Sequence, residues 1–189
     1  MDYTVGSVAP IVLLPFFAFA INAFIVKRLT GLAVGISVAA ILGSFFYSSR
    51  IFSDFVFNTY SSDYYIHKVF TWFDLKAPGV SNFAVDLGIY IDNMTAIMLL
   101  MVSGVASLIH IFSTYYMKDD PRYGQFFVYM SLFTSAMLGL VLSDNLLSLF
   151  IFWELMGFCS YSLIGFYYEK EGAGNASIKA FMTTRVGDV

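Results

Sequence analysis

The stretch Leu146–Tyr168, "LLSLFIFWELMGFCSYSLIGFYY", holds one charged side chain, Glu154, in an otherwise apolar run. About 20 apolar residues are enough for a helix to cross a hydrocarbon core about 30 Å thick. The stretch therefore predicts a membrane-spanning helix with a carboxylate inside it. Because such a charge costs about 2.5 to 3.5 kcal/mol on insertion scales, we expect Glu154 to face a partner or water.

The composition of the whole chain agrees with a membrane protein. Hydrophobic residues make up 59% of the 189 residues. Charged residues make up 12%, against about 25% in a typical soluble domain. The net charge is −3 and the ten Lys and Arg are dispersed, so neither a nucleic-acid surface nor a polybasic lipid-binding patch is indicated. The lipid bilayer is an expected partner, and nucleic acid is not.

Five membrane spans can be counted from the apolar runs. Besides Leu146–Tyr168 they are Val5–Val26, Leu29–Ser49, Asn93–Met117 and Gln125–Ser143. A sixth begins near Asn175, and the sequence stops before that helix could cross the bilayer. We therefore expect an N-terminal piece of a larger protein. The organisation predicted is two spans in 1–49, an external connection in 50–92, and spans three to six in 93–189.

The long connection between spans two and three predicts a β-hairpin. In its second half, polar residues alternate with aromatic or β-branched ones on both sides of "KAPGVSN", residues 76–82. This pattern is typical of two strands joined by a turn. The expected fold class is an all-α polytopic membrane protein with about six transmembrane helices and one external β-hairpin.

Basic residues in the short loops predict the orientation. Cytoplasmic loops are enriched in Lys and Arg, and these residues occur after the odd-numbered spans, at Lys27, Arg28, Lys118, Arg122 and Lys170. The N-terminus and the hairpin are therefore expected outside. The expected location is the bacterial cytoplasmic membrane.

Helical spacing indicates which residues share a face with Glu154. They are Phe150, Gly157, Phe158, Tyr161 and Gly165. Small residues allow another helix to approach closely, and Tyr161 could support the site with its hydroxyl. Two interpretations stay open. Glu154 either binds an ion or proton, as is the default for an ionisable group in a membrane, or is a neutral residue that donates one interhelical hydrogen bond.

The incomplete sixth helix adds Lys179, Arg185 and Asp188. Arg185 and Asp188 are three residues apart and can pair on one face. Lys179 lies near the start of the helix, where its long stem can reach the interface; a role in proton translocation is the alternative interpretation. His110, in the third span, is expected to pack between helices, with a role at a proton entrance as the alternative.

Other site chemistry is absent from the sequence. There is no glycine-rich phosphate loop, no paired His or Cys metal spacing and no Ser-His-Asp grouping. The single cysteine, Cys159, is expected to be a buried apolar residue. We expect no cofactor and no metal ion in this chain.

The segments "SDNLLSLFIFWELMGFCSYSLIGF" and "RVGD", residues 143–166 and 185–188, resemble the large antiporter-like membrane subunit of respiratory complex I, called subunit L or subunit 5. The resemblance covers about Asp86–Val189. It implies an antiporter-like fold with inverted helix repeats. It also implies that Glu154 takes part in proton translocation, with Arg185 and Asp188 in supporting roles and a lysine beyond residue 189 as partner.

Expected partners are the other membrane subunits and the remaining C-terminal helices of this subunit. NADH, FMN, iron–sulfur clusters and quinone are expected in partner subunits. Two alternatives remain: the related large subunit of a multisubunit cation/proton antiporter, which also has a "FWEL" core, and a purely structural membrane subunit.

Overall fold

The computed structural model describes residues 5–25, 29–57, 65–75, 83–170 and 172–188, which form six helices and one β-hairpin. In chain order the elements are α1 Val5–Ile25, α2 Thr30–Phe57, β1 Tyr65–Leu75, β2 Phe83–Ile91, α3 Asn93–Tyr116, α4 Tyr123–Val141, α5 Leu146–Ile164 and α6 Ala173–Gly187. Helices α1 to α5 are long and apolar enough to cross a membrane. The predicted helical multi-pass membrane fold is confirmed.

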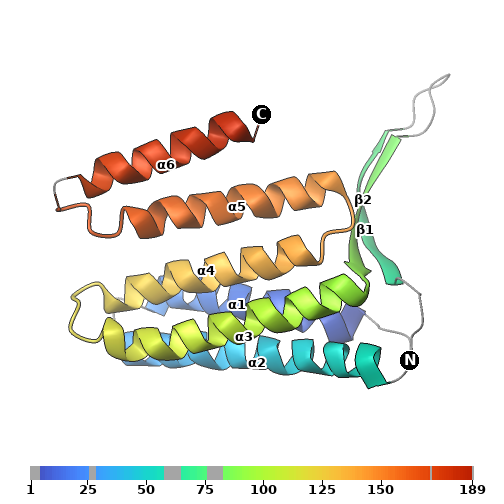
Figure 1. Cartoon of the computed structure of the whole chain (residues 1–189), viewed down its shortest axis with the longest axis horizontal. Coiled ribbons are helices and arrows are strands. Elements are labelled where there is room, and N and C mark those ends of the chain that lie inside the picture. The colour runs from blue at the N-terminus through green and yellow to red at the C-terminus, as the bar shows by residue number, and fades with distance from the viewer. Residues whose placement is uncertain (1–4, 26–28, 58–64, 76–82, 171, 189) are drawn as a thin grey trace.

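Helix α4 is the central element of the described structure, because it packs against α1, α2, α3 and α5. Helix α6 packs against α5 on the side away from α4 (Figure 1). The hairpin lies at the end of the bundle where α4 ends and α5 begins. This order places the helix that carries Glu154 between α4 and α6.

Buried polar contacts accompany the apolar core. The core is formed by side chains such as Ile11, Ile41 and Leu138. Beside it, the Nδ2 of Asn22 donates to the Oγ of Ser37 at 2.7 Å, and the Oγ of Ser131 donates to the same oxygen at 2.9 Å. These two hydrogen bonds join α1, α2 and α4. Lipid tails are as apolar as the core, so polar contacts help to decide which helices associate.

The two strands pair antiparallel, with Tyr65 opposite Ile91 and Leu75 opposite Phe83. The predicted hairpin is confirmed. Strand β2 also bonds to the turn between α4 and α5: the backbone N–H of Tyr90 donates to the carbonyl of Leu142 at 3.0 Å. This places the hairpin against the start of α5.

Side chains of the same turn extend the contact with the hairpin. The Nδ2 of Asn145 donates to the carbonyl of Asp86 at 2.6 Å, and the backbone N–H of Gly88 donates to Asp144 Oδ1 at 3.1 Å. Within the hairpin, Lys68 pairs with Asp86 at 2.7 Å. This contact holds the pKa of Asp86 below its ordinary value.

The largest differences from the predicted boundaries are at the ends of α2 and α5. Helix α2 continues to Phe57, so the predicted end of the second span at Ser49 is wrong. The prediction stopped at the first charge, Arg50, whereas a long side chain near a helix end can reach the interface without ending the helix. Helix α5 ends at Ile164, and α6 begins at Ala173. The predicted hairpin turn, 76–82, and the basic pair 27–28 lie outside the described residues.

Candidate functional site

The depth of Glu154 is set by a defined helix start. Asn145 is the N-cap of α5, and its Oδ1 accepts a hydrogen bond from the backbone N–H of Ser148 at 2.8 Å. Such a cap satisfies one of the unpaired N–H groups of the first turn. Glu154 follows eight residues after Leu146, which corresponds to about 12 Å along the helix axis.

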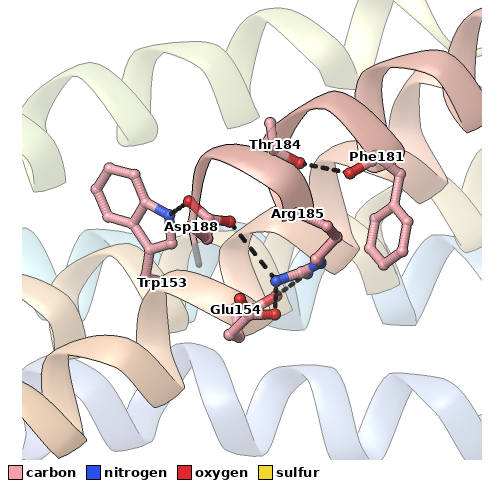
Figure 2. Close-up of polar contacts among 6 residues, drawn as sticks. All are labelled: Trp153, Glu154, Phe181, Thr184, Arg185 and Asp188. Carbon is pink, nitrogen blue, oxygen red and sulfur yellow. Dashed lines mark hydrogen bonds and ion pairs between the residues drawn. The ribbon is translucent and has the colours of Figure 1, made fainter.

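Arg185 of α6 is the counter-charge of Glu154. Its Nη1 forms an ion pair with Glu154 Oε2, and its Nη2 donates to the backbone carbonyl of Glu154 at 3.2 Å (Figure 2). The guanidinium therefore contacts both the side chain and the main chain of one residue. A Cβ atom at Gly157 would lie 3.1 Å from Nη2, so the glycine leaves the space that this contact occupies.

Asp188 is the second carboxylate at the same guanidinium. Its Oδ2 lies 3.8 Å from Arg185 Nη1, and its Oδ1 accepts a hydrogen bond from Trp153 Nε1 at 3.0 Å. Figure 2 shows Trp153 and Glu154 reaching α6 from adjacent positions of α5. The predicted pairing of Arg185 with Asp188 is confirmed. We refer to Glu154, Arg185 and Asp188 as the charged cluster; the three side chains are between 17% and 29% exposed.

An aromatic pair borders the charged cluster. The Phe181 ring lies 4.5 Å from the central guanidinium carbon of Arg185, and its centroid is 5.3 Å from that of Tyr161. One turn further along the chain, at the C-cap of α5, a Cβ atom at Gly165 would lie 3.0 Å from the Oγ of Ser177. The predicted close approach of a helix to the glycine face of α5 is confirmed, and the approaching helix is α6. Phe150 and Phe158, predicted on the same face, are 48% and 47% exposed in the described structure.

Lys179 and His110 lie apart from these contacts. Lys179 is exposed on α6, and the part of the chain described here gives it no ion pair. His110 is buried in α3, with Nδ1 2.8 Å from the carbonyl oxygen of Ala106 and its ring against Phe127 of α4. A role of either residue in proton transfer stays a prediction.

Two contacts of the site were not predicted from the sequence: the Glu154–Arg185 ion pair and the hydrogen bond from Trp153 to Asp188. The Glu154–Arg185 pair was missed, because the family resemblance implied a lysine beyond residue 189 as the partner of Glu154. Trp153 was missed as a donor, although it stands next to Glu154. Across residues 5–25, 29–57, 65–75, 83–170 and 172–188, no three His, Cys, Asp or Glu side chains gather as metal ligands, and Cys159 is buried.

Two family models match the chain. The model described as "NADH-Ubiquinone oxidoreductase (complex I), chain 5 N-terminus" matches residues 78–127, and the model described as "NADH:quinone oxidoreductase/Mrp antiporter, TM" matches residues 143–189. The second match contains the whole charged cluster.

Several curated proteins are similar in sequence. NADH-quinone oxidoreductase subunit L of Rickettsia bellii is 43% identical over 181 residues, which cover 94% of this chain and 27% of that protein. F(420)H(2) dehydrogenase subunit L of Methanosarcina mazei is 43% identical over 177 residues, covering 94% and 25%. Chloroplastic NAD(P)H-quinone oxidoreductase subunit 5 of Mesostigma viride is 52% identical over 108 residues, covering 57% and 17%. The chain thus spans about a quarter or less of the length of these relatives.

A solved structure shares the fold. A chain in the structure of the membrane-bound sulfane sulfur reductase, described as an archaeal respiratory membrane complex, superposes with a TM-score of 0.67 at 20% identity. The match covers 95% of this chain and 35% of that chain. The fold is therefore shared with a chain of that complex, and in sequence this chain is similar to the antiporter-like membrane subunits of NADH-quinone oxidoreductase, subunits L and 5.

Proposed function

We propose that this chain is part of a membrane subunit that carries protons across the bilayer, driven by a redox reaction in partner subunits. The observation that carries the proposal is the charged cluster between α5 and α6. Intramembrane ionisable groups are costly, and they mark ion or proton pathways in many membrane proteins. Here the cost is offset by an ion pair that joins α5 to α6.

The charged cluster has a composition suited to proton exchange. An arginine side chain stays charged in proteins, and here it faces two carboxylates. The cluster carries a net charge of −1 when both carboxylates are ionised, and it is neutral when one of them holds a proton. Proton uptake therefore changes the net charge without removing the guanidinium that organises the site.

The energy scale fits coupling to a membrane potential. At an effective dielectric constant of about 20, a unit charge brought within about 4 Å of the cluster changes its energy by about 4 kcal/mol. Moving one proton against 100 mV requires about 2.3 kcal/mol. A charge that approaches and withdraws during turnover would therefore be sufficient to load and unload the cluster. The proposed source of this moving charge is the lysine beyond residue 189 that the family resemblance implies. Lys179 is a further candidate.

The redox chemistry belongs to partner subunits in this proposal. NADH, FMN, iron–sulfur clusters and quinone would bind there, and the remaining helices of this subunit would complete the proton path. The Methanosarcina mazei relative is named as a subunit of an F(420)H(2) dehydrogenase. This name supports a membrane unit that works with more than one electron donor. The proposed location is the bacterial cytoplasmic membrane, with the N-terminus and the hairpin outside.

A second candidate is exchange of a cation for protons without redox chemistry. The family model over residues 143–189 is named for both quinone oxidoreductases and Mrp antiporters, which supports the comparison. Vesicles that contain the full complex separate the two functions. Pumping driven by NADH supports the first, and proton movement driven only by an imposed sodium or potassium gradient supports the second.

The experiment that tests the proposal replaces Glu154 by Gln in the full complex. We expect assembly to be normal and NADH-driven proton pumping in vesicles to fall strongly. The matched control is Glu169→Gln, the same chemical change at a carboxylate that is 68% exposed in the turn after α5. Unchanged pumping in the fully assembled Glu154→Gln complex would contradict the proposal and favour the neutral hydrogen-bonding interpretation.

A further inference from the structure

An apolar groove lies between α3 and α4, inside the part of each helix that can cross a membrane. Its volume is about 280 Å³. Four of its lining side chains are methionines, Met98 and Met101 on α3 and Met130 and Met137 on α4. An engineered apolar cavity of about 150 Å³ binds benzene, so this groove has space for a longer piece of hydrocarbon.

The groove offers its occupant no hydrogen bond. Thr134 has the one polar side chain among the described residues of the lining, and its Oγ1 donates to the backbone carbonyl of Met130 at 2.8 Å. A polar group placed against this lining would lose its hydrogen bonds to water without gaining new ones, which costs free energy. The occupant at this depth is therefore hydrocarbon.

The side chains of the lining favour a flexible chain over a second helix. Helix interfaces in membranes are enriched in small residues, which let two backbones approach closely. Neither glycine nor serine occurs among the described lining residues, and Ala106 is the smallest of them. Methionine is unbranched and adapts its shape to irregular neighbours. Such a surface suits an acyl chain, which has no fixed shape of its own.

The groove is continuous with the surface of α3 that faces the bilayer. Met101 lines the groove and is 59% exposed in the described structure, and Leu108, beside the lining residue Ile109, is 69% exposed. Both positions lie within a helix that is long and apolar enough to cross a membrane. Lipid chains that contact this surface can therefore enter the groove directly.

The position of the groove along α3 fits a chain that enters from the α3–α4 turn. The groove extends from Met98 to Ile109, which is about 16 Å along the helix axis, close to half of a hydrocarbon core about 30 Å thick. Phe112 and Tyr116 continue the same face of α3, and their rings stack with centroids 5.6 Å apart. Tyrosine is enriched at the level of the lipid headgroups. A lipid whose headgroup lies beside Tyr116 would reach Ile109 after about 10 Å and place the distal part of one chain in the groove.

We propose that the groove is a binding site for one acyl chain of a phospholipid, whose headgroup lies at the α3–α4 turn. A chain in the groove contacts two helices at once, so it gains dispersion contacts that a chain on the surface of a single helix lacks. This lipid therefore exchanges more slowly than the lipids around it. The site binds lipid whether or not the chain carries protons.

Photolabelling of the full complex tests the site. The complex is reconstituted with a phosphatidylcholine that carries a diazirine near the methyl end of one stearoyl chain, transferred into a large excess of unlabelled lipid, and irradiated. Adducts are then assigned to residues by tandem mass spectrometry. We expect adducts at Met101 and Met137 to survive the transfer and to exceed those at Leu108 severalfold, because Leu108 faces the bilayer outside the groove.

Two variants separate the groove from the surface beside it. Ala106→Phe places a ring in the groove, and Leu108→Phe places the same ring outside it. We expect Ala106→Phe to lower the surviving adducts at Met137, on the opposite helix, to the level at Leu108 in the unmodified complex. Leu108→Phe should leave the adducts at Met137 unchanged.

The unmodified complex provides a second measurement that needs no variant. With the diazirine moved next to the carbonyl end of the same chain, the surviving adducts should shift from Met101 and Met137 to Phe112 and Tyr116. Equal adducts at Met137 and Leu108 after the transfer would show ordinary surrounding lipid and overturn the site. Adducts that do not move with the diazirine, that persist in an assembled Ala106→Phe complex, or that are replaced by a cross-link to another polypeptide would overturn it as well.

Discussion

Asn145 performs two separate tasks, and two substitutions separate them. Its Oδ1 caps α5 through Ser148, whereas its Nδ2 donates to the carbonyl of Asp86 and to Asp144 Oδ1. Asn145→Asp keeps an acceptor for the cap and loses both donors. Asn145→Ala loses the cap and the donors together.

The magnitudes follow from the bonds removed. Each hydrogen bond contributes about 1 kcal/mol net. Only the bond from Nδ2 to the carbonyl of Asp86 joins the turn to the hairpin, since Asp144 lies in the turn itself, so both variants lose about 1 kcal/mol between the turn and the hairpin. Since 1.4 kcal/mol corresponds to about tenfold, local opening of β2 should become about fivefold more frequent. Loss of the cap contributes a further ~1 kcal/mol, or about fivefold, and is expected only in the Ala variant.

Hydrogen exchange on the complete complex measures these openings residue by residue. The amides of Gly88 and Tyr90 report the hairpin contact, and the amide of Ser148 reports the cap. A matched control is Asn175→Ala, at an exposed position of α6. Unchanged exchange in β2, or a Ser148 amide that responds equally to Asp and Ala, would refute the division of tasks.

Three further predictions concern the charged cluster and a helix start. Arg185→Gln removes the cation that two carboxylates share; because two negative side chains are then left without their counter-charge, we expect lower subunit abundance on an assembly gel together with lost pumping. Gly157→Val should displace the guanidinium and reduce pumping, whereas Gly35→Val, where a Cβ atom meets nothing within 4 Å, should not. Asp92 is the N-cap of α3, and its side chain accepts a hydrogen bond from the backbone N–H of Thr95. Burial alone would raise the pKa of Asp92, but hydrogen bonds led by that N–H outweigh burial and lower the pKa. The cap of α3 should therefore be complete above the ordinary Asp pKa and be lost as the pH falls through the lowered value. Asp92→Asn should make the protection factor of the Thr95 amide independent of pH in that range.

The sequence was sufficient for the spans and for one face of the site. Glu154 could be assigned to mid-span from the apolar run alone. The spacing of Gly157, Tyr161 and Gly165 predicted a face that meets another helix, and all three contact α6. These inferences depend on local periodicity, which a helix obeys whatever surrounds it.

The ion pair itself required the tertiary structure. Arg185 follows Glu154 by 31 positions, so the pair depends on the turn between the helices and on the register in which α6 docks. The sequence showed a pairing of Arg185 with Asp188, because three residues on one helix have a fixed separation. The contact of Asn145 with the hairpin was missed for the same reason as the ion pair, because its acceptor lies 59 positions away.

The Asn22–Ser37–Ser131 contact affects the depth at which Glu154 lies in the bilayer. A slip of α1 or α4 by one residue shifts it about 1.5 Å and rotates it by about 100°, which would break the bonds of Ser37. Interhelical hydrogen bonds in membranes contribute only about 0.6 kcal/mol each on average, so these bonds add little to total stability, yet a slipped helix would leave polar groups unpaired. They therefore fix the positions of α1, α2 and α4 relative to one another along the helix axes. Because α4 leads directly into α5, the depth of Glu154 in the bilayer depends on the hydrogen bonds that begin at the Asn22 side chain of α1.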